Sequence, residues 1–177
     1  MNDFSDWAIK RAEEKEKHKN AQFAKFKEHL PKIKEQAVSS IKIEYCGGGD
    51  SGEIQNLIYC DVDGREIYES CAWGCKDPTA LSKIFEAKNI PNAQYRGTTY
   101  RTDAKTGESV REQTYVDGSL NDIVEDVAYS LLPSGWEVNE GSRGTITFHL
   151  DETPVKVELE HGWEIIKTEW EAGTYEI

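Results

Sequence analysis

The spacing of apolar residues changes near Ser40, and this change limits the folds that the chain can adopt. Before it, apolar residues recur at intervals of three and four, which places them on one face of a helix: Phe23, Phe26, Leu30, Ile33 and Ala37. After it, apolar and charged residues alternate from Ile41 to Tyr45, as in a strand with one buried face. We therefore predict a helical arm over residues 1–39 and a single α+β domain over residues 40–177.

Within the arm, residues 10–20 carry almost no apolar side chain, so a helix there is expected to be solvated on nearly every face. The apolar stripe that follows is expected to pack on the sheet, and the alternative is a helix that pairs with a partner chain. Because Pro31 interrupts the stripe, we expect a kink or two abutting helices near Leu30.

The pattern after Ser40 predicts a mostly antiparallel sheet of five to seven strands, packed against one or two helices. Asp63-Gly64 is a hairpin signal, and Ser119 with Asp122 predicts a capped helix that ends at Pro133. A further helix is expected over residues 78–88, and residues 89–116 are expected to form a β-hairpin or a mobile loop. The expected strands cover residues 41–45, 54–60, 66–68, 136–138, 145–150, 155–159 and 163–170.

A glycine-rich run, Cys46 to Glu53, separates the first two strands and is the first candidate site. Glycine permits unusual backbone angles and lets other groups approach the main chain. We place a binding site on this run and on the polar segments expected beside it: Gly48, Gly49, Asp50, Ser51, Gly52, Glu53, Trp136, Asn139, Glu140 and His161. The oxygen ligands in this set suit Mg²⁺ or Ca²⁺, whereas the simpler interpretation is that Asp50 and Ser51 bond to their own loop.

Several other chemistries are not supported by the motifs. Gly49-Asp50-Ser51-Gly52 matches four letters of a serine-protease motif, but its flanks differ and no partner histidine motif precedes it. The run lacks the lysine ending of a P-loop. The four cysteines do not have a paired zinc spacing and are expected to be reduced thiols. We therefore expect no catalytic residue, metal or cofactor, although an enzyme is not excluded.

The net charge is −12, and residues 117–177 hold three basic side chains against fourteen acidic ones. This balance disfavours direct binding of nucleic acid and favours a basic protein surface as partner, including that of a nucleic-acid enzyme. The sequence shows no membrane-spanning run and no signal peptide. A cytoplasmic location is therefore expected.

Three motifs in order, GGGDSGEI, the helix after Ser119 and GWEVNEGSRGTITF, resemble the bacterial domain-of-unknown-function family 6878. The resemblance covers residues 41–60 and 119–177 and implies the same architecture, in a protein from a chromosome, plasmid or prophage-like region. It implies no established reaction. This chain departs from the family's motifs at three places: Ser142-Arg143, Gly162-Trp163-Glu164 and Tyr175.

Three hypotheses for function follow. The first is a non-enzymatic acidic module that masks a basic, nucleic-acid-binding surface, as an inhibitor or immunity-type protein of a phage or plasmid does. The second is a small ligand- or divalent-cation-binding domain, or an enzyme, centred on the GGGDSG run. The third is a homo-oligomer that assembles through the N-terminal helices.

Overall fold

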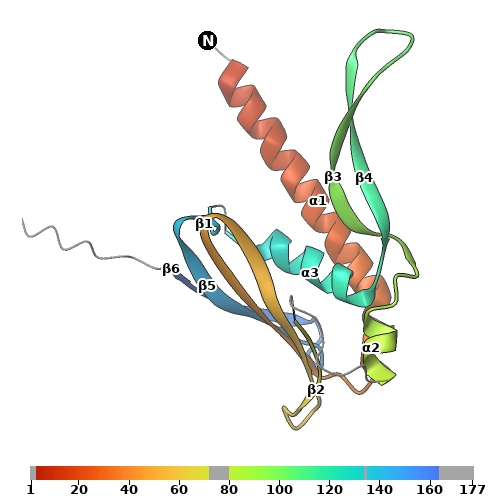
Figure 1. The fold of residues 1–177 in the computed structure, drawn as a ribbon, viewed down its shortest axis with the longest axis vertical. Helices are drawn as coiled ribbons and strands as arrows, with labels where there is room; N and C mark the ends of the chain where they lie inside the picture. Colours follow the sequence, from red (N-terminus) through yellow and green to blue (C-terminus); the bar gives the residue numbers. More distant parts are fainter. Residues whose placement is uncertain (1–2, 72–79, 134, 164–177) are drawn as a thin grey trace, which may run out of the picture.

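The computed structural model describes residues 3–71, 80–133 and 135–163 of the chain, which adopt an α+β fold (Figure 1). One sheet has the order β2-β1-β5-β6, and β3 and β4 form a separate two-stranded sheet. The elements in chain order are α1 (Asp3–Lys34), β1 (Ser40–Cys60), β2 (Glu66–Cys71), α2 (Ala80–Phe85), β3 (Ile90–Thr102), β4 (Ser109–Gly118), α3 (Leu120–Leu131), β5 (Val138–His149) and β6 (Lys156–Trp163). No helix of the described ranges combines the length and the apolar character needed to cross a membrane.

β1 folds back on itself and supplies two neighbouring arms of the larger sheet (Figure 1). Its first arm pairs with β5 and its second with β2. The Ser39 N–H donates to the Cys60 carbonyl at 2.8 Å, which closes the base of this hairpin. Because β1 contributes two arms, the sheet contains five extended segments, within the predicted range. Among the described strands, β3 and β4 pair only with each other, in the range where a β-hairpin or a mobile loop was expected.

The two helices α1 and α3 lie on one face of this sheet, and α1 packs on α3 (Figure 1). The core beneath them combines alternate residues of the strands with the apolar stripe of α3. Its largest fully buried side chains are Tyr45, Tyr59, Phe85, Phe148, Ile33, Ile41, Ile43, Leu57, Leu120, Ile123, Ile146 and Leu150. The alternation predicted from Ile41 to Tyr45 is therefore confirmed: Ile41, Ile43 and Tyr45 are buried on the face that the helices cover.

A single helix, α1, continues through Pro31, so the predicted pair of abutting helices is wrong. Pro31 lies in the last turn, and its carbonyl still accepts the Glu35 N–H at 2.9 Å. Proline is tolerated there because only one internal hydrogen bond is lost near the helix end. Ala37 lies beyond the helix with φ 60° and is exposed, so the predicted stripe ends at Ile33.

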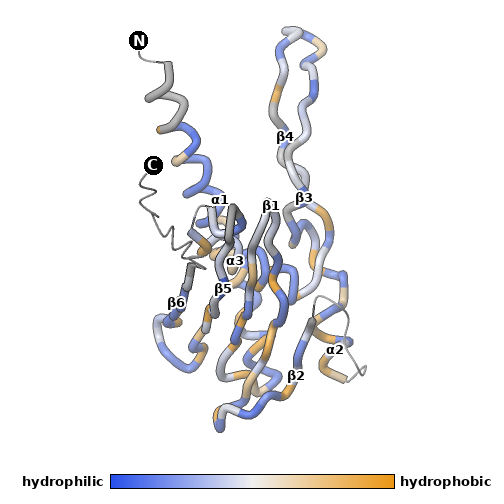
Figure 2. Tube along the Cα trace, turned by 60° about the vertical axis from the view of Figure 1, so that its left-hand side comes forward, coloured by the Kyte–Doolittle hydropathy of each residue, from blue (hydrophilic) through white to orange (hydrophobic). Residues whose placement is uncertain are grey.

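The first half of α1 and the β3–β4 hairpin project from the same end of the molecule (Figures 1 and 2). Residues 9–17 of α1 are exposed, as their polar composition predicts. Contacts at the base join the two projections: the Lys25 ammonium lies 4.3 Å from the Tyr115 ring centroid and also donates to the Asn92 carbonyl. The hairpin itself confirms the strand alternative for residues 89–116.

The N-terminus of α3 is held by the predicted capping box. The Ser119 hydroxyl accepts the Asp122 N–H at 3.2 Å, and the Asp122 carboxylate accepts the Ser119 N–H at 2.6 Å. Lys88 donates to the same carboxylate at 2.5 Å, which ties the segment before β3 to the helix. Burial acts to raise the pKa of Asp122, but the Lys88 ammonium and the hydrogen bonds of the capping box together hold it below its ordinary value.

Replacing Ser119 by Ala is expected to lower the free energy of unfolding by about 1–2 kcal/mol, because the cap of a buried helix end is lost. The matched control is Ser130→Ala, whose hydroxyl bonds back to the Val127 carbonyl of its own helix and is expected to matter by less than about 0.5 kcal/mol. Urea denaturation of both variants measures the difference. Equal losses would show that the capping box has no specific role.

Candidate functional site

The two glycine-containing motifs meet in the structure around Trp136. Gly47 and Gly49 of β1 pair with Ser142 and Asn139 of β5, so the predicted proximity of the two segments is confirmed. The indole of Trp136 is 9% exposed and meets Tyr45 edge-on, with ring centroids 5.7 Å apart. The Ser142 hydroxyl donates to the Trp136 carbonyl at 2.9 Å and fixes the segment before β5.

Several glycines of the two motifs are required by this packing. A Cβ atom on Gly52 would overlap the indole ring of Trp136, and one on Gly47 would lie 2.6 Å from the Trp136 carbonyl oxygen. Gly141 has φ 77° and lies where β5 holds one residue more than β1 between paired positions, which is a β-bulge. The glycine run is therefore mostly paired strand. Because Gly52 has no side chain, the Trp136 ring can pack against the main chain there.

His161 of β6 joins this cluster from the other side of β5. It lies across β5 from Tyr45, both being partners of Gly144, and the Tyr45 hydroxyl lies 2.5 Å from its Nδ1. The two rings stack with an interplanar angle of 18°. Burial raises the pKa of Tyr45, so the phenol remains protonated at neutral pH. The predicted grouping of His161 with Trp136 is thus found, as part of an aromatic stack.

The exposed part of the predicted site is the tip of the β1 hairpin. Gly48, Gly49, Ser51 and Glu53 are exposed, and an open hollow of about 500 Å³ lies along this run and Gln55. The side chains of Asp50, Asn139 and Glu140 lie outside the described part. Among the described residues, no three His, Cys, Asp or Glu side chains lie close enough together to hold a metal ion. Cys46 and Cys60 are free thiols, and Cys75 lies outside the described ranges.

Gly52→Ala is expected to lower the free energy of unfolding by about 2–3 kcal/mol, because the added methyl group overpacks the Trp136 ring. Gly162→Ala is the control, since its added Cβ would meet only the Arg143 carbonyl oxygen at 3.7 Å. Thermal and urea unfolding measure both. In a Trp136→Leu background the cost of Gly52→Ala should shrink, and a cost that stays the same would contradict the proposed contact.

A second polar cluster lies where α3 meets the β1–β2 hairpin. The buried Tyr59 hydroxyl donates to Asn121 at 2.7 Å, Asn121 donates to the Tyr68 hydroxyl at 3.1 Å, and Tyr68 donates to Glu86 at 2.7 Å. Nearby, burial and then the Asp122 charge raise the pKa of Glu125 to about 7. A perturbed carboxyl is a signal for a catalytic site. The chain of hydrogen bonds beside Glu125, however, joins β1, β2, α3 and the residue after α2, and we interpret this cluster as structural.

Glu125→Gln tests this interpretation through the pH dependence of stability. The folded state disfavours the Glu125 carboxylate, so its contribution to stability falls as pH rises from 4.5 through about 7. Above pH 7 the glutamine variant should be more stable than the parent by about 1–2 kcal/mol, allowing for solvent screening. Below pH 4.5 the two should be equal. Chemical denaturation across this range is the measurement, with Glu53→Gln on the exposed hairpin as control.

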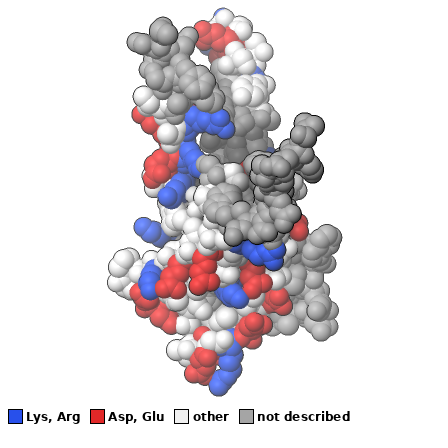
Figure 3. All heavy atoms as spheres, turned by 90° about the vertical axis from the view of Figure 1, so that its left-hand side faces the viewer, with Lys and Arg blue, Asp and Glu red and all other residues white. Residues whose placement is uncertain are grey.

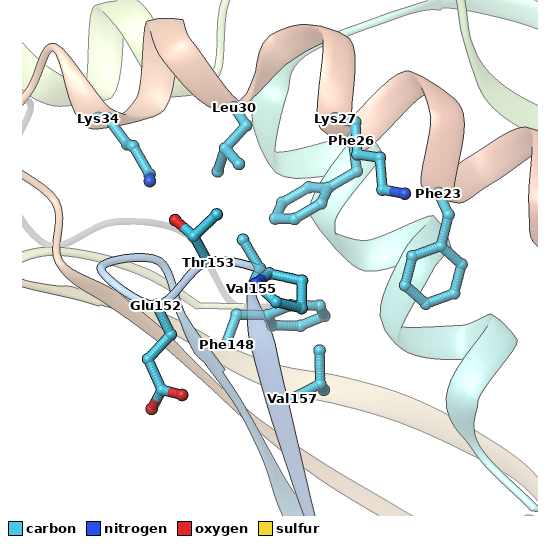
Figure 4. Close-up of a pocket in the computed structure, with 11 residues that line it drawn as sticks. Phe23, Phe26, Lys27, Leu30, Lys34, Phe148, Glu152, Thr153, Val155 and Val157 are labelled. Carbon is cyan, nitrogen blue, oxygen red and sulfur yellow. The ribbon is translucent and has the colours of Figure 1, made fainter.

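An apolar groove, which the sequence did not predict, lies between α1 and the β5–β6 end of the sheet (Figure 4). It has a volume of about 410 Å³, within the range of ligand-binding pockets. Phe23, Phe26 and Leu30 hang over it from α1, while Phe148 and Val157 form its floor. Lys27, Lys34 and Glu152 lie at its rim and are exposed.

The groove exists because α1 buries only part of its apolar stripe. Phe26 is 3% exposed and packs on Phe148 with ring centroids 5.3 Å apart, and Ile33 is fully buried. Phe23 and Leu30 are only half-buried. The expectation that the stripe packs on the sheet is thus confirmed for Phe26 and Ile33. Phe23 and Leu30 form a wall of the groove instead. The signal was present in the sequence, but spacing alone does not show how far a helix stands from a sheet.

No protein-family model, no curated protein and no solved structure matched the chain when it was compared with known proteins. Its function is therefore inferred from the geometry of the two sites.

Proposed function

We propose that this chain is a non-enzymatic protein-binding module whose partner is a basic protein. The observation that carries the proposal is the apolar groove, which is open to solvent beside β6. Soluble proteins rarely leave a large contiguous apolar surface open unless it binds something. Leu159 of β6 lies on the same face of the strand as the groove residue Val157 and is 43% exposed.

The side chains most suited to catalysis lie in or beside structural contacts. Tyr45 and His161 stack on each other, and Glu125 lies beside a network that joins four elements. These contacts support binding over catalysis, because a reactive group needs access to a substrate.

The charge of the surface supports a basic partner. Figure 3 shows that acidic side chains predominate over the sheet-containing part of the face in view, with basic ones between them. Some of these charges neutralise one another, as Lys156 does with Glu158 at 2.6 Å and Lys42 with Glu44 at 2.7 Å. The net charge of −12 still favours encounter with a positively charged surface.

In its biological form, the proposal is a cytoplasmic inhibitor or immunity-type protein that masks the nucleic-acid-binding surface of a partner. The second candidate, a ligand site on the β1 hairpin, is supported by the open hollow that includes Ser51 and Glu53. It is weaker because two of the four glycines there, Gly47 and Gly52, are explained by contacts with Trp136.

Salt dependence tests the main proposal. The immobilised full chain is expected to retain proteins from a panel of purified basic nucleic-acid-binding proteins at low salt and to lose them as salt rises, because surface charges are screened. Duplex DNA should compete for the same partner. Retention of size-matched acidic proteins, or retention of basic ones without dependence on salt, would contradict the proposal.

A further inference from the structure

We propose that β6 binds an extended segment of the basic partner by strand addition, and that alternate apolar side chains of this segment fill the groove. The inference rests on the proposed function and specifies the chemistry of the partner: a strand in which apolar residues alternate with lysine or arginine. In strand addition, main-chain hydrogen bonds provide affinity and pockets for alternate side chains provide specificity.

β6 is available as a template because it is the last strand of its sheet among the described residues. The strand expected over residues 163–170 lies, beyond Trp163, outside them. One edge pairs with β5 over its whole length, from Lys156 to Trp163, and no strand of the described residues lies along the other edge. An edge strand of 8 residues presents a row of main-chain donors and acceptors. Natural edges are shielded by bulges, proline or charged side chains. β6 is regular in its pairing with β5 and carries its charged residues, Lys156, Glu158 and Glu160, on one face only.

The register of β6 determines which side chains of an added strand would enter the groove. Val157 and Leu159 lie opposite the buried Phe148 and Ile146, so both face the helices. Residues of an added strand that lie opposite them would face the same way. They would extend the floor of the groove, beneath the wall that Phe23 forms (Figure 4).

The other face of β6 favours basic residues on the added strand. Glu158 and Glu160 are exposed on this outer face, opposite Thr147 and Thr145 of β5. The neighbouring Lys156 pairs with Glu158 at 2.6 Å, so Glu160 is the acidic side chain that is left to meet a basic residue. Cross-strand pairs of opposite charge are favourable. On the groove side, Lys27 and Lys34 would repel a basic residue. The edge would therefore select a strand whose basic residues all lie on the outer face and whose apolar residues lie on the groove face.

A second copy of the chain is the competing occupant of this edge. An antiparallel pairing of β6 with itself centred on Glu158 places the two Glu158 side chains opposite each other, and it also places Lys156 opposite Glu160 at both ends. Centring it on Leu159 places Glu158 opposite Glu160 of the other copy. A basic strand avoids these contacts between acidic side chains, and sedimentation of the parent chain distinguishes the two occupants.

The probe is a short synthetic peptide that alternates valine with lysine, labelled with fluorescein and titrated with the full chain by fluorescence anisotropy. It is expected to bind, whereas a peptide with glutamate in place of lysine, and one whose residues are rearranged to remove the alternation, are expected to bind at least about tenfold more weakly. N-methylation removes main-chain N–H donors, and the donors of alternate residues point to the same edge of a strand. Methylating the residues whose N–H groups point toward β6 should abolish binding. Methylating the residues between them, whose N–H groups point away, should have little effect.

Two pairs of variants assign the peptide to β6. Leu159→Gln is expected to weaken binding about fivefold to tenfold, while Val62→Gln, which alters an 81% exposed residue of the β1–β2 turn, should not. Glu160→Lys should weaken binding of the lysine peptide and improve binding of the glutamate peptide. Glu66→Lys, on the opposite edge strand β2, makes the same change in net charge and should do neither.

The outcomes separate this inference from the proposed function. If Leu159→Gln and Glu160→Lys bind the peptide as the parent does, or if both methylated peptides bind equally, strand addition at β6 is wrong. If a basic partner from the panel is still retained by these variants, the protein-binding function stands and its surface lies elsewhere. A dimer of the parent chain in sedimentation that Leu159→Gln dissociates would assign the edge to a second copy and overturn the inference.

Discussion

The packing of the Trp136 indole against the main chain of β1 is the contact on which one whole end of the sheet depends. The ring lies where a side chain on Gly52 would collide with it, and a side chain on Gly47 would collide with the Trp136 carbonyl, so the first motif needs glycine at both positions. The same ring contacts Tyr45, which stacks on His161 of β6. One aromatic column therefore connects the hairpin of β1 with the far edge strand.

Much of the fold follows from local patterns. Ser119 and Asp122 predict the start of α3 because a capping box is a short-range device, and Asp63-Gly64 predicts the β1–β2 hairpin for the same reason. The glycine run was harder to interpret, since a strand without side chains and an open loop look alike in sequence. What distinguishes them is the indole of a residue more than eighty positions away. The groove depends on the distance between α1 and β6, which no spacing in the sequence reports.

The polar groups divide into those that fix the fold and those that remain exposed to solvent. Lys88, Asp122 and Ser119 form one bonded set at the start of α3, and Tyr59, Asn121 and Tyr68 form another. Both sets are satisfied internally and bury their charge or hydroxyls at modest cost. By contrast Glu160 is exposed on the outer face of β6, where it can act on whatever approaches that edge, while its neighbour Glu158 pairs with Lys156 and His149.

The register of the central strands has a consequence for the order in which the chain can fold. β1 pairs with β5 from Ser40 with His149 onward, so the middle of the sheet joins residues from opposite ends of the described chain. The β1, β1–β2 and β3–β4 hairpins are local and can form as soon as they are synthesised. Until β5 emerges from the ribosome, one arm of β1 and the buried face around Tyr45 lack their neighbour. Until β5 is made, the nascent chain therefore carries an unpaired edge of β1, and the projecting, highly charged α1, which precedes β1, is already present at that stage.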